Sequence, residues 1–119
     1  MAVKEAVELL KKGRYYAQRT KFREAFAYYN KALALDPKNP EGWYLRASVL
    51  VDTGKHEEAL ADCDRALALN QNYSDAYINR AVIYLNHGNK GLGCLDAQKA
   101  CELGNCRILE MAKGRGDCR

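Results

Sequence analysis

The sequence predicts an all-α protein in which three helix-turn-helix repeats stack into an α-α superhelix, a solenoid closed by a short C-terminal helix. Three observations lead to this fold class. The 119-residue chain repeats itself at a period of about 34 residues, and each repeat contains two segments of helical periodicity. Breaks between these segments fall at Thr20, Gly54 and Gly88, which keep the same spacing. No segment shows the alternating pattern of a β-strand.

The repeat is clearest where residues 25–44 are aligned with residues 59–78. The alignment places similar side chains at equivalent positions, namely Ala32 and Ala66, Leu35 and Leu69, and Trp43 and Tyr77. We therefore expect repeats at about 6–39, 40–73 and 74–107, all within a single domain that spans residues 1–119.

Each repeat is expected to hold two helices. In chain order they are predicted at about 3–18, 22–35, 40–53, 56–69, 74–87 and 90–103. Pro37 and Pro40 separate the first repeat from the second, because a proline disfavours helical geometry in the residue before it. Asn70 and Asn72 stand at the next junction. The acidic run of Glu57, Glu58, Asp62 and Asp64 is interpreted as the solvated face of the fourth helix.

A seventh helix is predicted at about 106–113, because the last repeat of a solenoid needs a cap with a polar outer face. Asn105 is expected to be its N-cap. Ile108, Leu109 and Ala112 would form its apolar stripe. Residues 114–119 are expected to be a mobile tail.

The pattern of small and large side chains resembles that of the tetratricopeptide repeat (TPR) family, over about residues 3–107. The predicted packing positions are Leu9, Gly13, Tyr16, Ala25, Tyr29, Ala32, Trp43, Ala47, Ala59, Ala66, Tyr77, Ala81, Tyr84 and Ala100. Small residues allow two helices to approach closely, and the large ones fill the space toward the next repeat. The resemblance implies a right-handed superhelix.

The resemblance also implies that the first helices of successive repeats line a concave groove. Its expected lining is Leu10, Lys11, Arg14, Tyr44, Leu45, Ser48, Asp75, Ile78, Asn79 and Val82. Some TPR domains hold the C-terminal carboxylate of a chaperone with donor side chains at five of these positions. Here Leu10, Leu45 and Asp75 replace three of the donors, so this clamp is disfavoured. An apolar centre with Lys11 and Arg14 at one end predicts a peptide with an apolar anchor and an acidic flank.

Five cysteines are present, and three of them fall between residues 94 and 106. Buried thiols are the favoured interpretation, since Cys63 occupies a repeat packing position. A disulfide among Cys101, Cys106 and Cys118 remains an alternative, as does zinc, although no C-x-x-C pair is present.

Composition restricts the function classes. The net charge of +4 is small, so nucleic acid is disfavoured as a partner. No apolar run is long enough to cross a membrane, and charges within the first ten residues argue against a secretory signal, so a cytoplasmic protein is expected.

No nucleophile, acid and base come together in the pattern, and no metal or cofactor is expected. The sequence therefore predicts a non-enzymatic protein-protein interaction module, monomeric or a weak homodimer. The alternatives are a self-assembling scaffold element and, less favoured, an RNA-binding repeat protein.

Overall fold

Seven α-helices and the turns between them make up the computed structural model, which describes residues 2–119. The helices are α1 (Ala2–Gln18), α2 (Phe22–Leu35), α3 (Pro40–Asp52), α4 (His56–Leu69), α5 (Ser74–Asn86), α6 (Lys90–Glu102) and α7 (Arg107–Gly114). Each helix end lies within one residue of its predicted position, and no strand occurs in the described part of the chain. The predicted all-α solenoid is confirmed.

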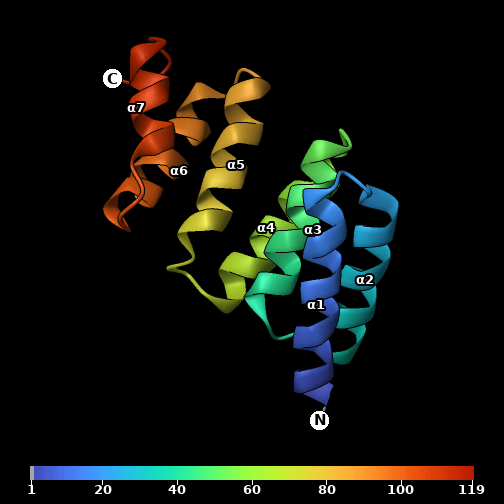
Figure 1. Ribbon diagram of the computed structural model, residues 1–119. Helices are drawn as coiled ribbons and strands as arrows, with labels where there is room; N and C mark the ends of the chain where they lie inside the picture. The colour runs from blue at the N-terminus through green and yellow to red at the C-terminus, as the bar shows by residue number, and fades with distance from the viewer. Residues whose placement is uncertain (1) are drawn as a thin grey trace.

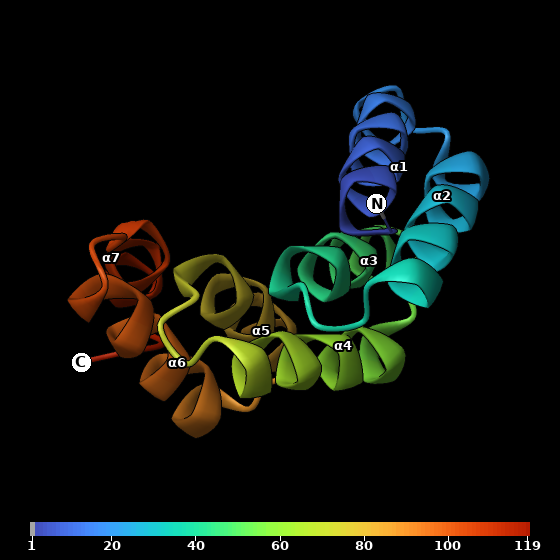
Figure 2. The same cartoon turned by 90° about the horizontal axis from the view of Figure 1, so that it is seen from below.

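The helices pair in chain order, α1 with α2, α3 with α4 and α5 with α6, and the pairs form a row from the N-terminus to the C-terminus (Figure 1). Seen from below, the row is curved (Figure 2). Helices α1, α3 and α5 lie on the inner side of the curve, and α2, α4 and α6 lie on the outer side. The molecule measures 46 × 26 × 20 Å.

Small residues sit where paired helices approach most closely. Ala25, Ala47 and Ala81 have no exposed surface. Gly13 is also buried, and a Cβ atom at this position would overlap the ring of Tyr29, so α1 and α2 can pack this closely only with glycine. The repeat pattern thus acts by setting the distance between helices.

The large aromatic residue of the pattern performs the same task in consecutive repeats. Trp43 donates its indole N–H to the carbonyl of Pro37 at 2.8 Å, and Tyr77 donates its hydroxyl to the carbonyl of Gln71 at 3.0 Å. Each bond ties the first helix of a repeat to the turn that precedes it.

Two buried carboxylates bind arginines across the helix pairs. Arg46 donates two hydrogen bonds to Asp62, at 2.7 and 2.9 Å, and one repeat later Arg80 binds Asp96 in the same way, at 2.8 and 2.9 Å. Asp62 is 1% exposed, so the prediction that it belongs to a solvated face is wrong. The residue is buried because the paired guanidinium group replaces the water that its carboxylate would otherwise need.

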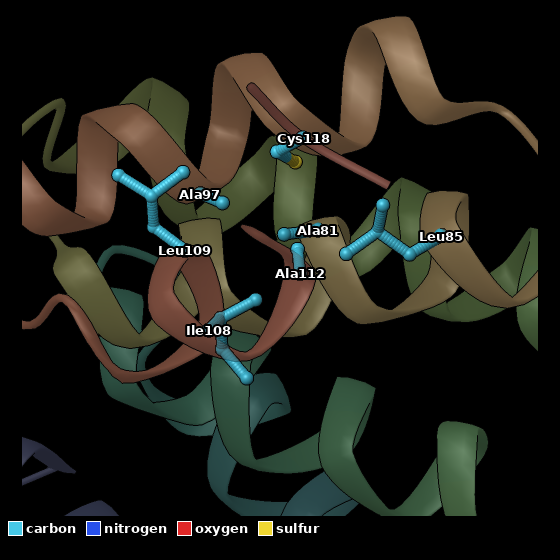
Figure 3. Close-up of a cluster of buried hydrophobic side chains, with 7 residues drawn as sticks. All are labelled: Ala81, Leu85, Ala97, Ile108, Leu109, Ala112 and Cys118. Atoms are coloured by element: carbon cyan, nitrogen blue, oxygen red, sulfur yellow. The ribbon is translucent and has the colours of Figure 1, made fainter. Parts of the chain in front are cut away.

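Helix α7 covers the apolar end of α5 and α6. Its residues Ile108, Leu109 and Ala112 pack with side chains of both helices in one buried cluster, which Figure 3 shows. The helix begins at Arg107, so the predicted N-cap is displaced by one residue, to Cys106, whose side chain makes no capping bond. Asn105 instead accepts a hydrogen bond from the Arg107 N–H at 3.2 Å.

The predicted mobile tail is packed. Cys118 is 7% exposed and belongs to the same cluster (Figure 3), while Asp117 accepts ion pairs from Lys90, at 3.4 Å, and Arg115, at 3.2 Å. The chain after α7 therefore folds back onto α6.

Four of the five cysteines form disulfides, Cys94 with Cys118 and Cys101 with Cys106. The favoured interpretation as buried thiols is therefore wrong for these four, and it holds for Cys63, which is fully buried and free. Burial raises the pKa of the Cys63 thiol to about 12, so this group stays protonated at neutral pH.

Candidate functional site

A cavity of about 420 Å³ opens between α1, α3 and α5, the first helices of the repeats. Helix α1 contributes Arg14, Ala17 and Gln18, α2 contributes Tyr29, and α5 and the turn before it contribute Asp75 and Tyr73. Helix α3 supplies the remaining six, Glu41, Tyr44, Leu45, Ser48, Val49 and Asp52. We call this site the concave pocket.

Three tyrosines line the concave pocket. The rings of Tyr44 and Tyr73 lie with their centroids 5.3 Å apart and are tilted by 48°. Tyr29, from α2, closes the floor and is only 1% exposed. Burial raises the pKa of all three phenols, to about 12 for Tyr29, and for Tyr73 the carboxylates of Glu41 and Asp75 raise it further. The hydroxyl groups therefore remain neutral and available for hydrogen bonding at physiological pH.

The charges around these rings are mostly negative. Glu41, Asp52 and Asp75 line the pocket, against one cation, Arg14. The Arg14 guanidinium lies 3.8 Å from the Glu41 carboxylate, so its charge is already partly compensated. Asp52 and Asp75 are exposed and form no ion pair within residues 2–119. The concave pocket is therefore an acidic site with an aromatic wall.

The structure brings together five of the ten residues predicted for the groove, Arg14, Tyr44, Leu45, Ser48 and Asp75. Asn79 lies beside them, since its side-chain amide donates to the Ser48 hydroxyl at 3.0 Å, and this bond joins α3 to α5. Ile78 and Val82 are partly buried against the cluster under α7 and do not line the pocket.

Two further residues predicted for the groove also lie outside the pocket. Leu10 is 2% exposed and packs in the core between α1 and α2, so it offers no surface to a ligand. Lys11 points to solvent and pairs with Glu8 at 3.2 Å on the same helix. The assignment of Leu10 to the groove is therefore wrong, and the positive end expected from Lys11 and Arg14 is reduced to Arg14 alone.

Sequence reasoning missed Tyr73, Glu41 and Asp52, and it gave Tyr29 only a packing role. Tyr73 could have been found, because it stands one repeat after Asn39, in a turn where polar residues are expected. Glu41 and Asp52, at the two ends of α3, carry no distinguishing pattern in the sequence.

Two sequence models of the tetratricopeptide repeat match the chain, one over residues 10–76 and the other over residues 63–92. The chain belongs to the tetratricopeptide repeat family. No curated protein sequence matches this TPR chain significantly.

Solved TPR domains have the same fold. The first TPR of Spaghetti (RPAP3), bound to the HSP90 peptide SRMEEVD, is 29% identical, with a TM-score of 0.88 over 94% of this chain and 90% of that one. The first TPR domain of human RPAP3 is 30% identical, with a TM-score of 0.85 over 92% and 87% of the two chains. The Arabidopsis OM64 TPR domain is 19% identical and shares the fold, with a TM-score of 0.89 over 97% and 96%.

The TPR fold is a protein-interaction fold, built in this chain from the helices α1 to α7. Within residues 2–119, none of them has both the length and the apolar character that crossing a membrane requires.

Proposed function

We propose that this TPR chain is a non-enzymatic module that binds a peptide or helix of a partner protein in the concave pocket. The observation that carries the proposal is the pocket itself, in which Tyr44, Leu45 and Tyr73 form an accessible aromatic and apolar wall on the inner side of the solenoid. A few residues carry most of the binding energy in a typical protein interface, and tyrosine is enriched among them. A similar TPR domain bound to a peptide adds support.

The HSP90 peptide bound by that relative is not the ligand that we propose here. The sequence of that peptide, SRMEEVD, is acidic toward its end. In this chain Leu10, Leu45 and Asp75 stand where the resemblance implies donor groups for a carboxylate, and Asp75 would repel one. The partner therefore differs in chemistry from that peptide.

The test is a selection of peptides on the folded protein from a random displayed library, followed by titration of the selected peptides. Tyr44→Ala should weaken their binding at least about fivefold, because it removes an aromatic anchor from the centre of the pocket. Leu95→Ala is the matched control, since Leu95 is 60% exposed on α6, away from the pocket. Circular dichroism verifies that both variants remain helical.

Equal affinity of the wild type and Tyr44→Ala for every selected peptide would contradict the proposal. The same result would favour the alternative of a self-assembling element, for which light scattering over a concentration series should then show dimers. A cytoplasmic location stays a prediction, and the two disulfides are features more typical of oxidising compartments.

A further inference from the structure

The concave pocket has a charge that opposes the charge of the whole molecule. The chain carries a net charge of +4, whereas the pocket has three carboxylates and one arginine. Arg14 pairs with Glu41, so these two charges largely offset each other. The carboxylates of Asp52 and Asp75 have no ion partner in the described chain, and they therefore make the electrostatic potential in the pocket negative. An acidic partner segment would be attracted by the surface of the protein at long range and repelled inside the pocket.

We propose that the pocket selects an arginine-containing segment, whose guanidinium group lies against the Tyr44 and Tyr73 rings and reaches the Asp75 carboxylate. This inference rests on the proposed function and specifies its ligand. A guanidinium group fits both features, because its flat face stacks on aromatic rings and its edge donates several hydrogen bonds to a carboxylate. The apolar neighbours of that arginine would contact Leu45, which is only partly buried in the pocket wall.

The molecule already holds an arginine with the same combination of groups. Arg80 lies 5.6 Å over the ring of Tyr77, and its guanidinium edge binds the carboxylate of Asp96 at 2.8 and 2.9 Å. The side-chain hydrogen bonds to Asp96 raise the pKa of Arg80 above its usual value. A tyrosine face beside a carboxylate is therefore a stable arginine site in this fold. In the concave pocket the Asp75 carboxylate has no such cation among residues 2–119, because Arg14 pairs with Glu41.

The prediction of an acidic flank is replaced by this inference. That prediction relied on Lys11 and Arg14 acting together at one end of the groove. In the structure Lys11 pairs with Glu8 outside the pocket, and Arg14 pairs with Glu41, so neither leaves a free cation for an acidic ligand.

The experiment uses three tripeptides that differ only in the central residue, N-acetyl-Leu-Arg-Leu-amide and its glutamine and glutamate counterparts. Each is titrated into the isotope-labelled protein while the backbone amide resonances are followed by NMR. The arginine peptide should shift amides around Tyr44, Tyr73 and Asp75, with an affinity at least about tenfold higher than that of the glutamate peptide. Non-specific attraction to a protein of net charge +4 would give the glutamate peptide the higher affinity. The order of affinities expected from the pocket is the reverse.

The double variant Asp52→Asn with Asp75→Asn leaves Glu41 and Arg14, whose charges cancel. It should reduce the preference for arginine over glutamate to about twofold or less, with little effect on the glutamine peptide. The double variant Glu57→Gln with Glu58→Gln is the matched control, because it also removes two negative charges, at exposed positions of α4 on the outer side. This control should keep the full preference.

The outcomes separate the inference from the function on which it rests. If all three tripeptides shift the pocket amides with equal affinity, the pocket binds peptides and the selection for arginine is wrong. If the glutamate peptide binds more tightly, or if the asparagine double variant keeps the preference, the inference is overturned as well. Absence of pocket shifts with all three also overturns it, whereas the proposed function is judged by the library peptides and Tyr44→Ala.

Discussion

The disulfide between Cys94 and Cys118 should contribute most of the stability of the C-terminal cap. It joins α6 to the end of the chain and closes a loop with a sequence separation of 24 residues, which contains the whole of α7. A helix of eight residues is not stable by itself in water, so α7 depends on its contacts with α5 and α6. The disulfide keeps α7 near these contacts when the rest of the chain unfolds.

The expected magnitude follows from the loop that the bond closes. Removal of a cross-link over a loop of this length costs about 3.5 kcal/mol in chain entropy, whereas the short loop between Cys101 and Cys106 corresponds to about 2 kcal/mol. Cys118→Ala should therefore lower the midpoint of thermal unfolding by roughly 10 °C. Cys106→Ala, which removes the other disulfide, is the matched control and should have the smaller effect.

Unfolding is measured by circular dichroism against temperature and urea, with and without reductant. Thiol titration of the denatured, unreduced wild type should find one free thiol, that of Cys63, among the five cysteines. Reductant should destabilise the wild type and leave the stability of a variant without both disulfides unchanged. Five free thiols in the unreduced protein, or equal midpoints for the wild type and Cys118→Ala, would refute this reasoning.

Four further substitutions test the packing of the repeats. Arg80→Met should destabilise the fold by about 3 kcal/mol in urea titrations, because it leaves the buried carboxylate of Asp96 unpaired; a loss below about 1 kcal/mol would show that water replaces the arginine. Thr20 has a positive φ of 59°, and Gly88, at the equivalent position of the third repeat, has a φ of 79°. Thr20→Gly should therefore stabilise the fold by about 1 kcal/mol, and Gly88→Ala should destabilise it by about the same amount. Burial raises the pKa of Tyr29 to about 12 in the folded protein. The stabilisation that comes from burying the neutral phenol is therefore fully present below pH 10 and is lost as the pH rises toward 12. Tyr29→Phe should flatten the pH dependence of the urea midpoint in this range, and an unchanged slope would contradict this assignment.

The sequence was sufficient to predict the helices because the repeat supplies the same information three times. Each helix end could be compared with its equivalents one repeat away, and breaks at Thr20, Gly54 and Gly88 fixed the turns. The arginine and aspartate pairs carry the same signal, since Arg46 and Arg80 are spaced like Asp62 and Asp96. This regularity was present in the sequence and would have shown that Asp62 is not a surface residue.

The parts that the sequence did not predict depend on contacts outside the repeat. Cys118 follows the last repeat, so no equivalent residue indicates that the chain turns back after α7 and brings it to Cys94. The acidic character of the concave pocket has a similar origin. Glu41 and Asp52 stand at opposite ends of α3, and only the approach of Arg14 from α1 and Tyr73 from the turn before α5 makes them part of one site.

Helix α5 connects the concave pocket to the cap, and its two ends serve different purposes. Asp75, in its first turn, lines the pocket, whereas Ala81 and Leu85, toward its other end, pack under α7. The bond from Asn79 to Ser48 holds the middle of α5 against α3 independently of the cap. Loss of the cap should therefore loosen the C-terminal half of α5 first. Below the unfolding midpoint, Cys118→Ala should bind pocket ligands almost as the wild type does, whereas Asn79→Ala should weaken binding while the cap stays intact.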